Sequence, residues 1–202
     1  MINSVTRRHG RGLVPLVLAA LALSGGGALA QAAADLLPAK YREAGVIKVV
    51  TDAKYPPFQY IDESGNMVGF EVDLWNAVAK RLGVELEVTS VAFDSLIPGV
   101  QSGRWDIAME GITDNPERQQ IVSFVDYGYT TSSAYVLEEK GAAITDHLEL
   151  CGLIGAAQSG TEWVGMITSE MAAACTDAGK SAPTVSEFGT SEATLLSLYS
   201  GR

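Results

Sequence analysis

The sequence has few of the side chains that build metal sites or bind polyanions. Its 202 residues include two cysteines and two histidines, and no C-x-x-C pair occurs. A structural zinc site needs four such ligands, and His9 lies in the N-terminal segment that is identified below as a signal peptide, so we expect neither a metal nor a cofactor. Basic residues number 14 against 24 acidic ones. Nucleic acids and anionic membranes bind basic surfaces, so neither is an expected partner.

The sequence also lacks an apolar run of the about 20 residues that a membrane-spanning helix requires. The apolar run at 13–23 is too short for a membrane anchor; it follows three arginines and precedes Ala28-Leu29-Ala30. This order is typical of a secretory signal peptide. We expect cleavage after Ala30, export to the periplasm and no membrane-embedded part. Removing 1–30 leaves 11 basic against 24 acidic residues, a net charge near −13.

Cys151 and Cys175 both lie in the exported part of the chain. In an oxidising compartment an isolated pair favours a disulfide. Cys151 precedes an expected strand and Cys175 ends the expected helix after it, so the bond would tie these two elements together. A loop of this size stabilises by about 3 kcal/mol in the chain-entropy model. A metal site is the weaker alternative.

The first part of the mature chain alternates strand and helix patterns. The expected strands are 46–51, 85–91 and 106–109. One helix ends at Leu82, before Gly83, and a second, capped by Asp94 or Ser95, runs to Gly103. The first helix carries its apolar residues on one face: Val72, Trp75, Val78, Ala79 and Leu82. This order predicts an α/β domain with a mainly parallel sheet.

A second α/β set follows. A long strand at 132–138 and an inter-lobe crossing around 139–141 divide a first lobe, 31–137, from a second lobe, 138–202. The second lobe has expected strands at 153–157 and 184–187 and helices at 161–174 and 191–200. Two strands make a marginal sheet. We therefore expect the second lobe to be incomplete and the chain to be part of a longer protein.

Residues 109–124 contain the strongest candidate for a binding element. A strand end runs into a polar turn with Thr113, and Pro116 suits the first turn of a short helix that carries Arg118. Amides, a hydroxyl and a guanidinium around one concave place suit a carboxylate. On spacing alone, a surface ion pair of Arg118 with Glu117 or Asp114 is the commoner arrangement.

Short motifs occur in a fixed order along residues 42–202. They are YPPF at 55–58, GFEVDL at 69–74, FDSLIP at 93–98, GRWDI at 103–107, GIT at 111–113, ER at 117–118, LCG at 150–152, GAAQSGT at 155–161 and SGR at 200–202. This set resembles the extracellular solute-binding proteins of family 3, the periplasmic receptors of polar amino acid ABC transporters. The resemblance implies a type II periplasmic-binding-protein fold, in which two α/β lobes close over a small ligand.

The resemblance also implies roles for particular residues. Arg118 would grip the ligand carboxylate, Thr113 would add its N–H and hydroxyl, and Gly111 would accept from the ligand ammonium. The ligand-binding residues of the second lobe would be Gln158, Gly160 and Thr161, and the ligand side chain would pack between Tyr55 and Phe93. Each has a plainer alternative: Tyr55 and Phe93 could fill the core, and Thr161 is a good helix N-cap.

Glu110 and Glu162 depart from the family pattern. We hypothesise that one or both favour a cationic group on the ligand; the alternative is that Glu110 pairs with Arg104 or Lys54 or points to solvent. The family continues beyond the SGR motif into a strand whose aspartate neutralises the ligand ammonium. Without that carboxylate we expect this chain to bind weakly or not at all.

The expected function is therefore that of a monomeric periplasmic receptor that binds a small polar amino acid and delivers it to ABC transporter permease subunits. It is not expected to be an enzyme. Two alternatives use the same fold: a cyclohexadienyl dehydratase, and the ligand-sensing module of a membrane receptor. Fold alone does not choose among them.

Overall fold

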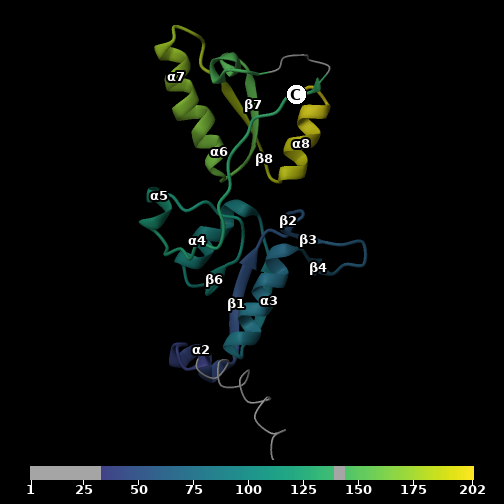
Figure 1. Ribbon diagram of the computed structural model, residues 1–202, viewed down its shortest axis with the longest axis vertical. Coiled ribbons are helices and arrows are strands. Elements are labelled where there is room, and N and C mark those ends of the chain that lie inside the picture. The colour runs from purple at the N-terminus through teal and green to yellow at the C-terminus, as the bar shows by residue number, and fades with distance from the viewer. Residues whose placement is uncertain (1–32, 139–143) are drawn as a thin grey trace, which may run out of the picture.

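The computed structural model describes residues 33–138 and 144–202, which form two α/β lobes, one above the other in Figure 1. The expected signal peptide and the segment 139–141 lie outside these residues. The division at 137/138 thus stays a prediction. The β-α-β order of the sequence does build a parallel sheet in each lobe, as expected.

The sheet of the first lobe has the order β5-β1-β6, with all strands parallel. Its strands are β1 (Val46–Thr51), β5 (Glu85–Ser90) and the short β6 (Ile107–Ala108). The central strand is rich in β-branched residues, and Val49 and Val50 are fully buried. Val46 aligns with Glu85, and Val49 aligns with Ile107. The carboxyl ends of β1 and β6 therefore meet at one edge of the sheet.

Helix α3 (Phe70–Leu82) ends where the sequence predicts, with Gly83 in the left-handed conformation at φ 70°. Its buried residues are Glu71, Trp75 and Ala79, spaced four apart. Val78 is 40% exposed, so its expected place on the buried face is wrong. It lies one residue, about 100° around the helix, from Ala79 and thus falls outside the narrow buried stripe.

The other helices of the first lobe are short: α2 (Ala39–Ala44), the 3-10 turn η1 (Phe93–Ser95), α4 (Leu96–Gln101) and α5 (Pro116–Gln119). Pro116 takes the first helical position of α5, as predicted. Ser95 takes the N-cap position of α4, one of the two residues predicted for it, but its hydroxyl donates to Asp94 Oδ1 and no side chain caps the helix. Leu96 instead joins Val50 and Trp105 in the hydrophobic core.

A small antiparallel sheet, β2-β3-β4, lies between β1 and α3, where the sequence predicted no strand. Its strands are β2 (Lys54–Tyr55), β3 (Gln59–Ile61) and β4 (Met67–Val68). Strands this short carry little periodicity, so pattern reasoning does not detect them. They hold Tyr55 close to the carboxyl end of β1.

The predicted strand at 132–138 is wrong, since its residues form no strand and pair with no segment in the described part of the chain. A strand exists only with a neighbour that takes up its backbone hydrogen bonds. The stretch contains the strand formers Tyr135 and Val136, but Tyr135 is exposed rather than packed on a sheet.

The second lobe is built on two parallel strands, β7 (Ile154–Gln158) and β8 (Thr184–Phe188), with Ile154 aligned to Thr184. Between them one continuous helical stretch comprises α6 (Glu162–Gly165), the π-helical turn η4 (Met166–Met171) and α7 (Ala172–Asp177). Helix α8 (Ser191–Tyr199) follows β8 and contacts β7. The predicted helices and strands here are all present, with ends shifted by up to three residues.

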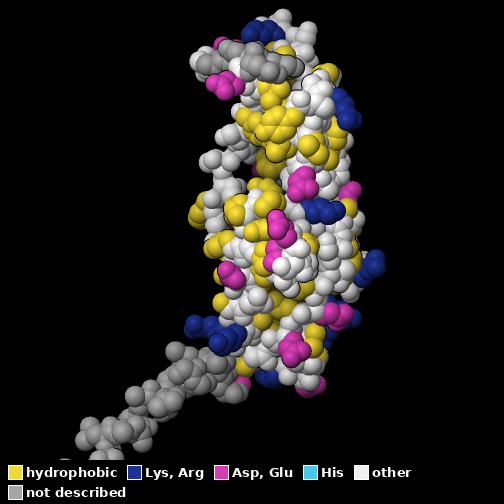
Figure 2. All heavy atoms as spheres, turned by 90° about the vertical axis from the view of Figure 1, so that its right-hand side faces the viewer, with side chains coloured by type: hydrophobic (Ala, Val, Ile, Leu, Met, Phe, Trp, Pro, Cys, Tyr) yellow, Lys and Arg dark blue, Asp and Glu magenta, His cyan; other side chains and the backbone are white. Residues whose placement is uncertain are grey.

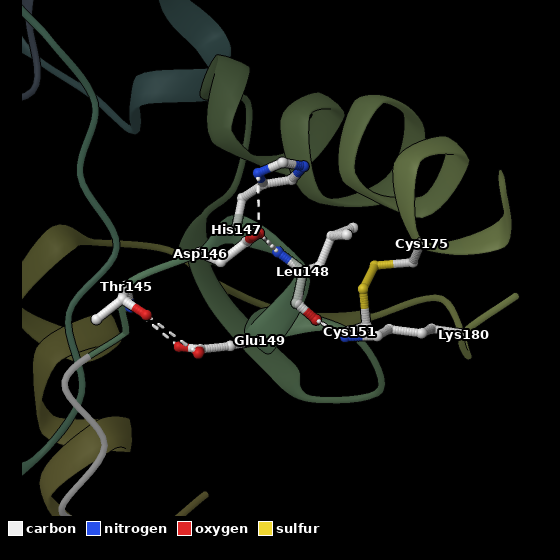
Figure 3. Close-up of polar contacts among 8 residues, drawn as sticks. All are labelled: Thr145, Asp146, His147, Leu148, Glu149, Cys151, Cys175 and Lys180. Carbon is white, nitrogen blue, oxygen red and sulfur yellow. Dashed lines mark hydrogen bonds and ion pairs between the residues drawn. A yellow bond between two sulfur atoms is a disulfide. The ribbon is translucent and has the colours of Figure 1, made fainter. Parts of the chain in front are cut away.

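The predicted disulfide joins Cys151 to Cys175, with a Cα–Cα distance of 5.6 Å. Figure 3 shows how it ties the segment after the 3-10 turn η3 (His147–Leu150) to the buried side of α7. Lys180 Nζ donates to the Leu148 carbonyl beside it, 3.0 Å away. The disulfide thus links the start of β7 to α7, the helix that covers the sheet.

Figure 2 shows hydrophobic side chains gathered on the second lobe, on the side where α8 lies in Figure 1. Leu196 and Tyr199 of α8 are among the exposed large apolar residues. Among the described helices, none has the length and apolar character needed to cross a bilayer.

Candidate functional site

Arg118 links the two lobes. The side chain of Asn115 caps α5 by accepting a hydrogen bond from the Arg118 backbone N–H at 2.9 Å. This bond fixes the backbone position from which the Arg118 side chain extends. Its guanidinium donates to the Thr113 carbonyl at 2.7 Å and, across the lobe junction, to the Gly160 carbonyl at 3.0 Å. The alternative of a surface ion pair with Glu117 or Asp114 is wrong within the described residues.

The guanidinium is half-buried. Burial lowers the pKa of Arg118, while the charges of Glu162 and Glu117 act in the opposite direction. Because arginine titrates so far above neutrality, the group stays cationic. A guanidinium has five N–H donors, and the two hydrogen bonds to carbonyls leave donors for an incoming anion.

Gly160 approaches the first lobe closely. Its φ is +80°, and a Cβ built on it would lie 2.9 Å from the Cα and Cβ of Asp94. Glycine is therefore required here by both conformation and space. Thr161 opens α6, but its hydroxyl donates to the Gln158 carbonyl at 2.6 Å and makes no cap hydrogen bond. The predicted residues of the second lobe thus lie together at the junction.

Gln158, at the carboxyl end of β7, also reaches the first lobe. Its side-chain amide donates to Asp52 Oδ2 at 3.1 Å, and both side chains are buried. The other Asp52 oxygen accepts from the Lys54 backbone N–H at 2.9 Å. A third contact between the lobes joins the Ser191 hydroxyl to the Lys54 carbonyl.

Glu110 is 6% exposed and follows β6. Its Oε2 accepts from the Thr51 hydroxyl and from the Asp52 backbone N–H, each at 2.8 Å. The three alternatives considered for it are wrong: it does not point to solvent, it pairs with neither Arg104 nor Lys54, and Arg104 instead lies over the Trp105 ring. Burial, together with the nearby Asp52 carboxylate, raises the pKa of Glu110 to about 8.

Glu71 is a second buried acid that sequence reasoning missed. It is 1% exposed, and the Tyr127 hydroxyl donates to its Oε1. Burial raises the pKa of Glu71, against the hydrogen bond from Tyr127, and the charge of Asp52 raises it further. Burial and the Glu71 carboxylate in turn raise the pKa of Tyr127. The remaining oxygen, Glu71 Oε2, is buried and has no hydrogen-bond partner in the described chain.

The other predicted residues of the first lobe are only partly brought together. Tyr55 lies beside Gly111, where an added Cβ would be 3.6 Å from Tyr55 Cε1 and from Glu71 Oε1. The Tyr55 ring stacks on Phe58 at 5.1 Å. Phe93 packs against the Val50–Leu96–Trp105 core, and among the described residues no ring contact joins it to Tyr55. This packing supports the alternative that Phe93 fills the core.

Asp52 could have been found from the sequence. Asp52 and Glu110 each follow a strand of the parallel sheet, and such strands place their carboxyl ends at one edge, where ligands of open α/β sheets bind. Glu71 and Tyr127 gave no comparable signal, because their contact joins a helix to an irregular segment 56 residues later.

One cavity of about 430 Å³ lies elsewhere on the first lobe. Its lining residues are Asp94, Ser95, Pro98, Gly99, Ser102, Arg104 and Trp105. It contains none of the residues predicted to bind ligand. In the described residues no group of histidine, cysteine and acidic side chains has the arrangement of a metal site.

Comparison with known proteins relates this arrangement to binding proteins. The arginine-binding protein ArgT of Corynebacterium glutamicum is 29% identical over 83% of this chain and 55% of its own length. A probable histidine-binding protein of Neisseria gonorrhoeae is 36% identical over 69% of this chain and 52% of its own. The cyclohexadienyl dehydratase of Pseudomonas aeruginosa is 40% identical over 41% of this chain and 31% of its own. The chain thus spans about half the length, or less, of these relatives.

Two solved structures share the fold. An ancestral amino acid-binding protein, described as a precursor of cyclohexadienyl dehydratase, has a TM-score of 0.68 and 30% identity, over 81% of this chain and 70% of its own. An ancestral arginine-binding protein bound to arginine has a TM-score of 0.67 and 34% identity, over 78% and 67%. These likenesses identify the type II periplasmic-binding-protein fold. Residues 47–193 match the family profile, and the chain belongs to the bacterial extracellular solute-binding proteins, family 3.

Proposed function

We propose that this chain belongs to a periplasmic receptor that binds an amino acid with a cationic side chain at the junction of its lobes, for delivery to an ABC importer. The observation that carries the proposal is the half-buried guanidinium of Arg118, which reaches Gly160 of the other lobe and has no ion-pair partner among the described residues. A ligand carboxylate is the natural partner of such a group.

Buried carboxyl groups near the same junction support a cationic side chain. Asp52, Glu71 and Glu110 are buried acids, and Asp52 contacts the second lobe through Gln158. A ligand with a carboxylate at one end and a cation at the other would match both the guanidinium and these acids. The arginine-binding relatives agree with this choice of ligand.

The receptor mechanism needs no covalent chemistry. A ligand that contacts Arg118 in the first lobe and Gly160 or Thr161 in the second binds best when the lobes are together. It therefore stabilises the closed arrangement by its differential affinity for that arrangement. The permease subunits would then recognise the closed protein.

Isothermal titration calorimetry of the purified chain tests the proposal. Since weak binding is expected, L-arginine and L-glutamine are titrated to about 10 mM, which covers the affinity range of weak complexes. We expect arginine to bind more tightly than glutamine, and Arg118→Lys to lose at least about tenfold in affinity, because lysine cannot form the planar fork. Arg81→Lys, on the exposed side of α3, is the matched control. Binding of glutamine as tight as that of arginine, or an unchanged affinity in Arg118→Lys, would contradict the proposal.

A dehydratase is the second candidate, because Glu110 is a buried carboxyl group whose pKa is raised to about 8. Such a group is protonated at neutral pH, as a general acid must be. Incubation with prephenate separates the two candidates: turnover that is lost in Glu110→Gln would favour the enzyme, and no turnover together with arginine binding would favour the receptor.

A further inference from the structure

Three buried carboxyl groups come together from different parts of the first lobe: Glu110 Oε2 accepts from the Asp52 N–H, and Glu71 Oε1 lies beside Gly111, the residue after Glu110. Asp52 follows β1, Glu71 is in the first turn of α3, and Glu110 follows β6; they are 3%, 1% and 6% exposed. None of the ion pairs in the described chain includes any of them. The other titratable groups that face them are Tyr55 and Tyr127.

The hydrogen bonds of this carboxyl cluster are unevenly distributed. Asp52 accepts from the Lys54 N–H and from the Gln158 amide. Both donors to Glu110 act on Oε2, which leaves Oε1 able to carry a proton. Glu71 accepts from Tyr127 through Oε1, and its buried Oε2 has no partner in the described residues. A buried oxygen without a donor is costly unless a ligand or water supplies one.

Like charges in a buried cluster cannot all ionise without compensation. The pKa shifts of Glu71 and Glu110 agree with this expectation. Burial and the neighbouring carboxylates raise the pKa of both, that of Glu110 to about 8. At neutral pH the cluster therefore holds a proton. A ligand cation next to the cluster would stabilise the ionised carboxylates. The cluster could then release its proton without leaving an uncompensated negative charge.

We propose that the carboxyl cluster of Asp52, Glu71 and Glu110 is a proton-linked selector, which releases a proton from Glu110 when the cationic side chain of the ligand enters. The O–H bond of the Glu110 carboxyl group breaks, the proton passes to solvent, and the resulting carboxylate compensates the ligand cation. A ligand with a neutral side chain gives no such compensation and leaves the proton in place. This inference rests on the proposed function, because it requires the ligand to bind at the lobe junction.

Calorimetry in buffers of different ionisation enthalpy counts the released protons. Titrations of the wild-type chain with L-arginine and with L-glutamine are repeated in phosphate and in Tris at pH 7. We expect up to one proton released per bound arginine and almost none per bound glutamine. Glu110→Gln should abolish the release, while Glu87→Gln, which removes an exposed acid from β5 of the same lobe, should leave it unchanged.

The affinity of the wild-type chain for arginine gives a second readout that needs no variant. If one proton leaves on binding, the affinity should rise by up to about tenfold per pH unit below the pKa of Glu110 and level off above it. Arginine binding with the same heat in both buffers and no pH dependence would overturn the inference and leave the receptor proposal standing. Glutamine binding as tight as arginine binding would contradict the ligand of the receptor proposal itself, and the inference with it.

Discussion

Gly99 lies in α4 against the indole ring of Trp105, and a Cβ at this position would overlap that ring. Trp105 belongs to the buried core with Val50 and Leu96, so moving the ring would disturb that core. We expect Gly99→Ala to lower the free energy of unfolding by about 1–3 kcal/mol, the usual cost of overpacking a core. Urea denaturation followed by tryptophan fluorescence measures the change.

Gly165 is the matched control for this substitution. It is also a helical glycine with ordinary dihedral angles, and a Cβ there would meet nothing within 4 Å. Gly165→Ala should be neutral or stabilising by less than about 1 kcal/mol, because alanine restricts the unfolded chain. Equal losses in the two variants would show that the Gly99 contact is not the cause.

At the scale of single residues, the sequence identifies what lies close along the chain and misses what folding brings together. Arg118 was found because Thr113 and the cap of α5 are local to it. The Glu71–Tyr127 contact spans 56 residues, and the Gln158–Asp52 contact spans 106. Without the relative position of the elements, no local pattern marks these residues as neighbours.

Helix α5 is only four residues long, so its cap matters to the side chain it carries. Asn115→Ala removes the acceptor of the Arg118 N–H and should cost about 1 kcal/mol of stability. We also expect weaker binding of the ligand arginine, because the backbone of Arg118, which positions its guanidinium, is no longer fixed by the cap. Asn115→Asp keeps an acceptor and should retain most of the affinity in the same calorimetric titration. A full affinity in Asn115→Ala would show that the cap does not position Arg118.

The disulfide acts on the second lobe as a unit, because it ties the start of β7 to α7. Replacing both Cys151 and Cys175 by alanine should destabilise this lobe by about 3 kcal/mol in the chain-entropy account. Trp163 is the tryptophan of this lobe and can report its unfolding separately from Trp75 and Trp105. A reducing agent should destabilise the wild type in the same way and leave the double variant unaffected; an effect on both would point to another cause.

Secondary structure elements were predictable where their own residues determine them. Strand β1 has a β-branched run, and α3 has an apolar face and a terminal glycine. The stretch 132–138 has an equally good strand pattern but no partner strand in the described chain. The short strands β2, β3 and β4 form because they pair with one another, which no single one of them signals.

For the whole molecule, the buried acids make stability depend on pH. The pKa of Glu110 is about 8 in the folded protein and about 4.3 in an unfolded chain. Between these values the folded state holds a proton that the unfolded state has lost, so stability falls as pH rises and levels off above about pH 8. The raised pKa of Glu71 acts in the same direction. Asp106 acts in the opposite direction. Burial raises its pKa, but hydrogen bonds from Lys40 and other donors outweigh burial and lower the pKa below its ordinary value. The contribution of Asp106 to stability is therefore lost only in acid.

We therefore expect the ligand-free chain to have a higher melting temperature near pH 5.5 than near pH 8. Glu110→Gln removes the titrating group but keeps an acceptor for Thr51 and the Asp52 N–H, so it should reduce this difference and raise the melting temperature most at pH 8. Glu87→Gln, on the exposed side of β5, should leave the slope unchanged. Differential scanning calorimetry across this range measures all three. A melting temperature that rises steadily from pH 5.5 to pH 8 would mean that Glu110 is already ionised in the folded protein, and a permanently charged cluster would then attract cations without releasing a proton.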